Sequence, residues 1–245
     1  MLRAGWRGLA AACAVALVAV AAACSKSERK MDNAGEMDEG MSMSMPAQGA
    51  DYTVVLRSTW TPQRHPFEYP TAGALTGPHF SGVIGATHSP AYSLFAVGSL
   101  PTAGLERLSE EGKHTPLDEE IRAAVAAGTA GALFESGPLR DFADSIVFTV
   151  HVDAAHPLIS FVNMVAPSPD WFTGAANVDL IENGSWVALR TIELPAYDSG
   201  GDDGTTYKAP DRDNNPKKPT SQAMTRHFVV NGVTVPVATV TFTRK

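Results

Sequence analysis

The sequence predicts an antiparallel β-sandwich with two helices covering one end, and three observations support this all-β fold class. Apolar and polar residues alternate from Ile146 to Val152, the pattern of a strand with one buried face. Asn183-Gly184 and Asn231-Gly232 are Asn-Gly pairs, which favour tight hairpin turns. Helical spacing of apolar residues is clearest between residues 102 and 128. Many strands joined by local turns favour a sandwich.

The most informative strand runs from Ile159 to Val165 and leads into an acidic loop. β-branched and large apolar residues fill this segment. Pro167 and Pro169 follow, and because proline has no backbone N–H, the strand must end before them. Asp170 comes next, followed by two aromatic residues that we expect to hold the loop against the core. A carboxylate at a sheet rim is a candidate ligand for a hard cation; the alternative is that Asp170 only caps a turn.

Further segments complete the expected sandwich. Residues 51–56 alternate in polarity and begin the folded part of the chain. Residues 73–93 are rich in Gly and His and are expected to form a loop with short strands. Residues 178–182 and 185–194 flank the first Asn-Gly pair as a hairpin. The last strand, residues 238–243, alternates apolar residues with threonine.

Two helices are expected between the early loop and the long strands. Thr102 offers a hydroxyl that caps the first helix, and Gly112 ends it. Thr115 is expected to cap the second helix, with Pro116 at the first helical position and Gly128 after the last turn.

The N-terminal residues predict export and membrane attachment. Arg3 and Arg7 precede an apolar run that ends at Ala23, which is too short to span a bilayer and is typical of a signal peptide. Small residues then precede Cys24, as in the lipobox of bacterial lipoproteins. We therefore expect residues 1–23 to be removed and Cys24 to carry lipid. The alternative is an ordinary secretory signal followed by an incidental cysteine.

Residues 24–50 are expected to be a flexible tether between the lipid and a folded domain of residues 51–245. The tether is polar, holds five of the eight methionines of the chain, and has no periodic apolar face. Met-x-Met spacing among acidic residues suits Cu(I), so a copper-handling lipoprotein is one alternative function. Ser25 follows the predicted lipidated cysteine, a pattern that indicates the outer membrane. We predict a cell-envelope protein, as an outer-membrane lipoprotein or in the periplasm or extracellular space.

A second acidic loop, residues 196–204, contains Asp198 after a predicted strand end. Its Asp-Ser-Gly-Gly segment resembles the nucleophile loop of trypsin-like proteases. However, Tyr197 replaces the expected glycine, and His156 is too close in sequence for the two barrels of that fold. Residues 211–215 resemble half of an EF-hand loop but lack its glycine and its final Glu. The net charge of −7, without a basic stripe, argues against nucleic-acid binding.

Several motifs together resemble the spondin N-terminal domain, also called the F-spondin/mindin domain. In chain order they are Pro78-His79-Phe80-Ser81, Gly85-Ala86-Thr87-His88, Tyr92-Ser93-Leu94-Phe95, Gly104-Leu105-Glu106, Glu110-Glu111-Gly112, His156-Pro157-Leu158-Ile159-Ser160-Phe161-Val162, Pro167-Ser168-Pro169-Asp170-Trp171-Phe172-Thr173-Gly174, Asp179-Leu180, Trp186 and Tyr197-Asp198-Ser199-Gly200. Their order and spacing extend over almost all of residues 51–245. The Pro-Ser-Pro-Asp-Trp-Phe string is the most specific of them.

The resemblance implies an eight-stranded sandwich similar to a C2 domain, with one calcium ion at its rim. Two ligand positions of the family match Asp170 and Asp198. A third family ligand is an acid on the preceding strand, where this chain has His151; Asp153 lies two residues further on and faces the same side. Calcium prefers oxygen ligands, whereas imidazole suits transition metals. We therefore predict Ca²⁺ with Asp153 assisting; the alternative is Zn²⁺ or Mn²⁺, if His151 coordinates.

Metal-dependent adhesion or recognition by exposed loops is the predicted function, rather than catalysis. The resemblance implies adhesive roles that in animals involve extracellular matrix, integrins and microbial surface glycans. We therefore expect a cell-surface glycan or protein as ligand, and the membrane as a partner of the lipid anchor. The rival class is a metal-dependent hydrolase with the same acids and with His151 or His88 as general base, although no spacing of base and nucleophile supports it.

Overall fold

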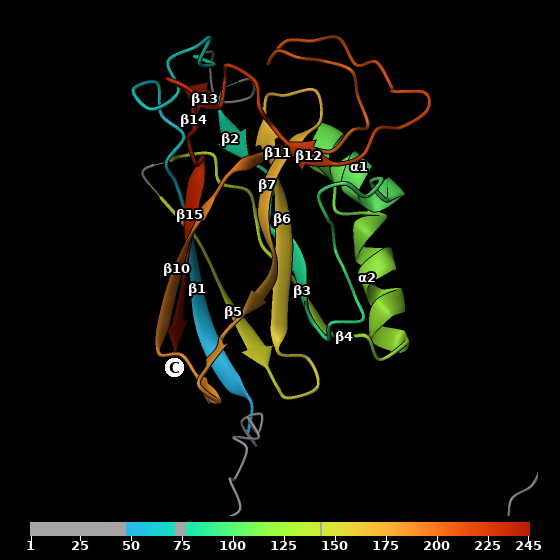
Figure 1. Cartoon of the computed structure of the whole chain (residues 1–245), viewed down its shortest axis with the longest axis vertical. Coiled ribbons are helices and arrows are strands. Elements are labelled where there is room, and N and C mark those ends of the chain that lie inside the picture. The colour runs from blue at the N-terminus through green and yellow to red at the C-terminus, as the bar shows by residue number, and fades with distance from the viewer. Residues whose placement is uncertain (1–47, 72–76, 143) are drawn as a thin grey trace, which may run out of the picture. The chain divides into compact units, whose positions relative to one another are not determined.

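A computed structural model describes residues 48–71, 77–142 and 144–245, which form a sandwich of two antiparallel sheets (Figure 1). The first sheet has the strand order β10-β15-β1-β5 and consists of β1 (Ala50–Ser58), β5 (Ile146–Val152), β10 (Leu189–Leu194) and β15 (Ala238–Arg244). The second has the order β12-β11-β7-β6-β3-β4, with β2 also paired to β6. Its strands are β2 (His79–Phe80), β3 (Ile84–His88), β4 (Ala130–Glu135), β6 (Leu158–Ala166), β7 (Trp171–Asp179), β11 (Ala196–Asp198) and β12 (Ser221–Gln222).

The observed sandwich confirms the predicted fold class. Eight strands of five or more residues make up the two sheets, as the resemblance implied, and the short strands β2, β11 and β12 extend the second sheet. Between the sheets lie the buried residues of alternating strands such as β1, where Tyr52, Val54 and Leu56 face the core. Val54 pairs directly with Phe242 of β15, so apolar cross-strand neighbours close this core.

Both faces of the second sheet are buried, which explains where the helices lie. All five residues of β3 and eight of the nine residues of β6 are buried. The helices α1 (Ala103–Glu111) and α2 (Leu117–Ala126) cover the outer face of this sheet (Figure 1). Leu105 of α1 and Ile121 of α2 belong to one buried apolar cluster with Val162 of β6. The expectation that the helices cover one end of the sandwich is therefore wrong: a strand that is apolar on both faces requires a layer on each side.

Helix α1 has the predicted ends, whereas α2 has the predicted C-terminal glycine, Gly128 with φ of 74°, but not the predicted N-cap. Thr102 Oγ1 accepts a hydrogen bond from Leu105 N at 3.1 Å, and Gly112 adopts a left-handed conformation with φ of 66°. Helix α2 begins one residue later than expected, with Pro116 as its N-cap and no side-chain hydrogen bond at that end. The acidic first turn of α2 compensates, because carboxylates there interact favourably with the helix dipole.

Two predicted turns are confirmed, and one predicted loop is a strand. The short hairpins β8–β9 (Ile181–Glu182 and Ser185–Trp186) and β13–β14 (Val229–Val230 and Val233–Thr234) turn at Asn-Gly pairs, and all four of these turn residues have positive φ. Trp171 and Phe172, expected in a loop, are the first residues of β7. They do hold the adjacent turn to the core, since both side chains are fully buried.

The predicted signal peptide, Cys24 and the Met-rich segment lie outside the described residues. Strand β1 begins at Ala50, one residue before the expected domain boundary, and Trp186 Nε1 donates to Gln48 O at 2.7 Å beside it. Within the described ranges, neither helix has the length and apolar character needed to cross a membrane.

Candidate metal centre

The candidate site is built around Asp170, at the turn between β6 and β7. Strand β6 ends at Ala166 and β7 begins at Trp171, so the prolines end the first strand as predicted. Trp171 N donates to Ser168 Oγ at 3.0 Å and closes the turn. The Trp171 ring packs between Tyr207 and other aromatic residues of the core. Asp170 is thereby fixed at the rim with 0% of its surface exposed.

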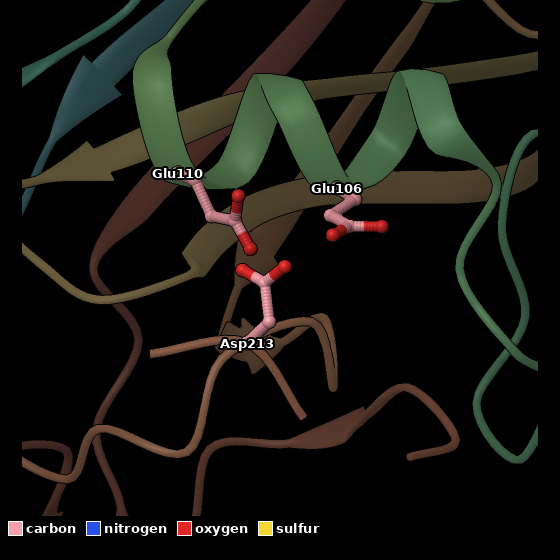
Figure 2. Close-up of side chains that lie close together, drawn as sticks. All are labelled: Glu106, Glu110 and Asp213. Carbon is pink, nitrogen blue, oxygen red and sulfur yellow. The ribbon is translucent and has the colours of Figure 1, made fainter. Parts of the chain in front are cut away.

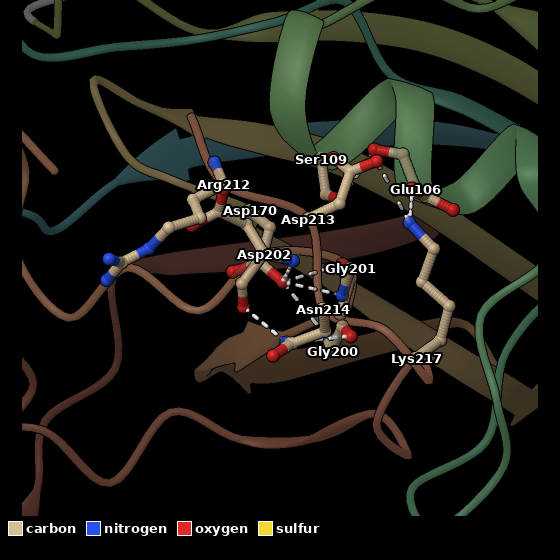
Figure 3. Close-up of polar contacts among 11 residues, drawn as sticks. Glu106, Ser109, Asp170, Gly200, Gly201, Asp202, Arg212, Asp213, Asn214 and Lys217 are labelled. Atoms are coloured by element: carbon tan, nitrogen blue, oxygen red, sulfur yellow. Dashed lines mark hydrogen bonds and ion pairs between the residues drawn. The ribbon is translucent and has the colours of Figure 1, made fainter. Parts of the chain in front are cut away.

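One oxygen of Asp170 accepts four hydrogen bonds from the loop that follows β11 (Figure 3). Asp170 Oδ2 lies 2.9 Å from Ser199 Oγ, 2.9 Å from Gly200 N, 3.0 Å from Gly201 N and 3.2 Å from Asp202 N. Successive backbone N–H groups that point at one anion form a concave anion-binding loop. These hydrogen bonds therefore fix both the conformation of the loop and the position of the Asp170 carboxylate.

Two glycines make this close wrapping feasible. Gly200 has φ of 87°, and a Cβ there would meet Lys218 O at 2.1 Å. A Cβ on Gly201 would meet Glu110 Oε1 of α1 at 2.7 Å. The Asn214 amide closes the back of the loop by donating to the carbonyls of two of its residues, at 3.1 and 2.7 Å. The loop is thus fixed between α1 and the sheet rim.

The other oxygen of Asp170, Oδ1, is buried and has no hydrogen-bond partner. Burial raises the pKa of Asp170, with hydrogen bonds from the loop opposing this shift. Asp198 is a neighbouring acid: Gly200 N, 2.9 Å from Asp170 Oδ2, is also 3.0 Å from Asp198 Oδ1. Burial, together with the charge of Asp170, raises the pKa of Asp198 to about 6. Neither carboxylate forms an ion pair with any of the described residues.

A third acid, Asp202, belongs to the same centre and was not predicted. It is 3% exposed, and its charge contributes to the raised pKa of Asp170. Its two carboxylate oxygens accept from the backbone N–H groups of Gly204 and Arg212. The signal in the sequence was a second acid four residues after Asp198 in a glycine-rich loop. Asp202 is thus a buried acid beside Asp170, but the ligand atoms of Asp170, Asp198 and Asp202 do not all lie within 4.8 Å of one another. Carboxylate oxygens are the ligand type of a hard divalent cation.

The structure does not bring His151 and Asp153 to this rim. His151 lies on β5 and contacts Asp51 of the neighbouring strand β1, with Nδ1 to Oδ1 at 2.8 Å. Asp153 Oδ1 accepts from Ala155 N and His156 N at 2.8 and 2.7 Å, so it caps the turn before β6.

The nine residues of β6 separate that turn from Asp170, a distance of about 26 Å along a strand. One ion cannot contact both ends (Figure 1). The expectation that His151 or Asp153 completes the metal site is therefore not met.

A separate acidic cluster lies on the α1 side of the loop (Figure 2). Glu106, Glu110 and Asp213 each direct a carboxylate oxygen into it, and these atoms lie within 4.8 Å of one another. Lys217 forms an ion pair with Glu106 and lies 3.9 Å from Asp213, so the chain supplies its own cation (Figure 3). Burial and the charge of Glu106 raise the pKa of Glu110 to about 7.

The groups considered for a hydrolase do not assemble into one site. His88 is fully buried; its Nε2 lies 2.7 Å from Ser160 Oγ and its Nδ1 lies 2.8 Å from Ser89 O, which fixes it inside the second sheet. Ser199 donates its hydroxyl to Asp170 and contacts no histidine among the described residues. His151, the other proposed base, lies at the far end of β6.

The fold and the site together define a β-sandwich domain with a carboxylate-lined rim between the β6–β7 turn and the loop after β11. The chain belongs to the Spondin_N family, whose sequence model matches residues 50–230. This confirms the family that the motifs indicated. Strand β15 lies beyond the matched residues, yet it occupies the middle of the first sheet, between β10 and β1.

Similar proteins include Spondin-2 of Homo sapiens, which is 30% identical over 178 residues that make up 72% of this chain and 53% of Spondin-2. Spondin-1 of Mus musculus is 30% identical over 177 residues, 69% of this chain and 21% of that protein. Spondin-1 of Xenopus laevis is 30% identical over 213 residues, 80% of this chain and 25% of that protein. The chain thus spans about half the length of Spondin-2 and a quarter or less of Spondin-1.

Proposed function

We propose that this chain is a lipid-anchored recognition or adhesion domain of the cell envelope whose rim is organised by a calcium ion. The observation that carries the proposal is Asp170 Oδ1, a buried carboxylate oxygen without any partner. Burying an ionised carboxylate is costly unless a counter-charge accompanies it. Among the described residues, no cationic side chain forms an ion pair with Asp170, although the charge of Lys218 acts on neighbouring Asp198. A bound cation would supply the counter-charge.

The donor set favours calcium over zinc or manganese. Asp170, Asp198 and Asp202 offer only carboxylate oxygens, the ligand type of Ca²⁺, while the imidazole that favoured Zn²⁺ or Mn²⁺ lies at the other end of the sandwich. A bound ion supplies positive charge between the carboxylates. The chain itself holds the loop in place through the four hydrogen bonds to Asp170 Oδ2.

The position of the N-terminal strand supports recognition of a ligand away from the membrane. β1 begins beside the end of β5, because Ala50 pairs with Val152. That end of the sandwich is opposite the Asp170 rim (Figure 1). The chain that precedes β1 therefore enters the sandwich at the end away from the rim, so an anchor on that side leaves the rim free to contact a cell-surface glycan or protein.

Thermal melting and calorimetric titration of the purified protein test the metal site. Calcium should raise the melting temperature relative to chelator, because an ion that binds only the folded state stabilises it by about 2.7 kcal/mol at 100 times its dissociation constant. Asp170→Asn and Asp198→Asn should each abolish most of this gain. His151→Ala and Asp153→Asn are the matched controls at the other end of β6 and should keep it. A melting temperature that no divalent cation changes would contradict the proposal.

The anchor is tested by metabolic labelling and fractionation. We expect Cys24 to take up radiolabelled palmitate and Cys24→Ser to release the protein from membranes, because the lipid is the proposed attachment. Palmitate that never enters the wild-type chain would disprove the anchor while leaving the metal site unaffected. Cu(I) affinity that is lost on deleting residues 25–47 would instead support the copper-handling alternative.

A further inference from the structure

Strand β10 is an edge strand whose outer side has no partner strand. The order of the first sheet ends at β10, and among the strands that the structure describes only β15 pairs with it (Figure 1). All of its residues, Leu189–Leu194, pair with β15 without a shift in register. The strand has no proline, lysine or bulge, the features that usually protect an edge from further pairing. β10 is therefore a regular edge that another strand can join.

The register shows which backbone groups of β10 point outward. Arg244 N donates to Ala188 O at 2.9 Å, so the ladder is hydrogen-bonded at this position. Bonded and non-bonded positions alternate along an antiparallel pair, so the even-numbered residues of β10 bond to β15. The N–H and C=O groups that point away from β15 are then those of Leu189, Thr191 and Glu193. No turn or loop within the described ranges bonds to these groups.

A groove lies beside this edge, between β10 and the second half of β7. Its volume is about 400 Å³, within the range of ligand sites in proteins. The β7 side is lined by the small residues Gly174, Ala175 and Ala176, and the β10 side contributes Ile192 and Leu194. Because the residues on the β7 side are small, the groove has room for an aliphatic side chain of a strand that joins β10.

The edge of β7 across the groove is less suited to pairing. β7 pairs with β11 only through residues 171–173, so its second half also ends the sheet on this side. Asn177 in this half has φ of 55°, and the register with β6 shifts between Ile159 and Phe161. Such an irregularity interrupts pairing along an edge. Asn177 N also has a partner already, since it donates to Ser160 Oγ at 2.8 Å. A strand beside the groove therefore pairs with β10.

The charges on β10 favour a basic partner. Glu193 is exposed and forms no ion pair with the residues that the structure describes. Arg190, the basic residue of β10, already contacts Glu182 and the backbone oxygen of Asp179. A basic side chain directly opposite Glu193 on an added strand would form a cross-strand pair of opposite charges, which stabilises strand pairing.

We propose that an extended peptide joins β10 as an antiparallel strand, with an aliphatic side chain in the groove and a basic side chain opposite Glu193. The outward N–H and C=O groups of β10 form the ladder with the peptide, and main-chain pairing of this kind selects a peptide backbone. Side chains alternate between faces, so the residue opposite Ile192 faces the groove and the residue opposite Glu193 lies on the outer face. The acids of the calcium rim do not line this groove, so the proposal does not depend on the rim.

Amide hydrogen exchange of the ¹⁵N-labelled full protein tests the proposal with acetyl-Lys-Val-Thr-Ala-Val-amide as the probe. Its lysine is placed opposite Glu193 and its first valine opposite Ile192. In the free protein the Thr191 amide should exchange rapidly, whereas the Ile192 amide should be protected by β15. A probe concentration of about ten times the dissociation constant should slow exchange at Thr191 about tenfold and leave Ile192 unchanged. The result should be the same in calcium and in chelator.

Two methylated probes test main-chain pairing without changing the protein. N-methylation of the probe's threonine removes the N–H that would donate to Thr191 O, so it should weaken binding about tenfold. N-methylation of the probe's alanine is the matched control: that N–H points away from β10, so the affinity should change less than about twofold.

A charge variant tests the basic position. Glu193→Gln should weaken binding of the probe about twofold to fivefold, the effect of one exposed ion pair. Glu119→Gln is the matched control, because it removes an equally exposed acid on α2, and it should leave the affinity unchanged.

Several outcomes would overturn the proposal. One is exchange at Thr191 that the probe does not slow up to its solubility limit. Another is equal affinity of the two methylated probes, which would show that side chains alone are recognised. Protection of Thr191 in the free protein that rises with protein concentration would show that a second copy of the chain occupies this edge instead.

Discussion

Removing the charge of Asp198 should stabilise the metal-free protein at neutral pH. Burial and the charge of Asp170 raise the pKa of this carboxyl group from 3.8 to about 6 in the folded state. A tenfold change in a proton-binding constant corresponds to about 1.4 kcal/mol, so the ionised group opposes folding by up to about 3 kcal/mol above pH 6. Partial access to solvent reduces this figure, and we expect Asp198→Asn to gain about 1–2 kcal/mol at pH 7.5.

The pH dependence gives the sign of the effect. Between pH 3.8 and 6 the folded state binds more protons at Asp198 than the unfolded state does, so the unfolding free energy rises as the pH falls through this window. The advantage of Asp198→Asn should therefore be largest at pH 7.5 and mostly gone by pH 4. Calcium should reverse the order at pH 7.5, because the ion binds the ionised carboxylates and stabilises only the wild type.

Urea unfolding in chelator at pH 7.5 and pH 4, followed by circular dichroism, measures these differences. Asp211→Asn is the matched control: the same substitution at an exposed position in the same acidic loop region, expected to change stability by less than about 0.5 kcal/mol. A metal-free Asp198→Asn protein that is less stable than wild type at pH 7.5 would refute the reasoning. It would show that the carboxylate is stabilised in the folded state without any cation.

Two further substitutions test the packing around the site and the core, each by urea unfolding. Gly201→Ala should lower the free energy of unfolding by about 1–3 kcal/mol, because the new Cβ would meet Glu110 Oε1 at 2.7 Å. Gly137→Ala is the control: its Cβ would have no atom within 4 Å, so the free energy of unfolding should change by less than about 0.5 kcal/mol. Equal effects would contradict the close contact between the loop and α1. Ser160→Ala should lower the free energy of unfolding by about 1–3 kcal/mol, because it leaves buried His88 Nε2 unpaired. An unchanged free energy of unfolding would show that the histidine has another partner.

The elements that the sequence predicted correctly are those whose signal is local. The Asn-Gly hairpins depend on two residues that tolerate positive φ, and the left-handed Gly112 marks the end of α1. The alternating strands follow from the period of two along β5 and β15. In each case the residues that show the pattern are the same residues that form the turn, helix end or strand. These elements can therefore be predicted without knowing which distant residues they contact.

The elements that were missed depend on distant contacts. Strand β4 has the sequence Ala-Gly-Ala-Leu-Phe-Glu, which has no strand alternation; it is extended because it pairs with β3 along Ile84–His88. The outer position of α1 and α2 likewise follows from the second apolar face of the sheet, which a strand pattern read one segment at a time does not show. Propensity is here overridden by tertiary packing.

The candidate site shows the same division between local and distant information. The period of two shows which face of a strand a residue occupies, but not which end of the sandwich it lies at. Asp153 shares a face with His151 on the chain leading into β6, yet β6 must cross the whole sheet before Asp170 is reached. Asp198 reaches Asp170 through register: it pairs with Trp171 across β11 and β7, which places it next to Asp170. The register between β11 and β7 therefore places Asp198 next to Asp170. The loop after β11 wraps around Asp170 and places Asp202 beside it.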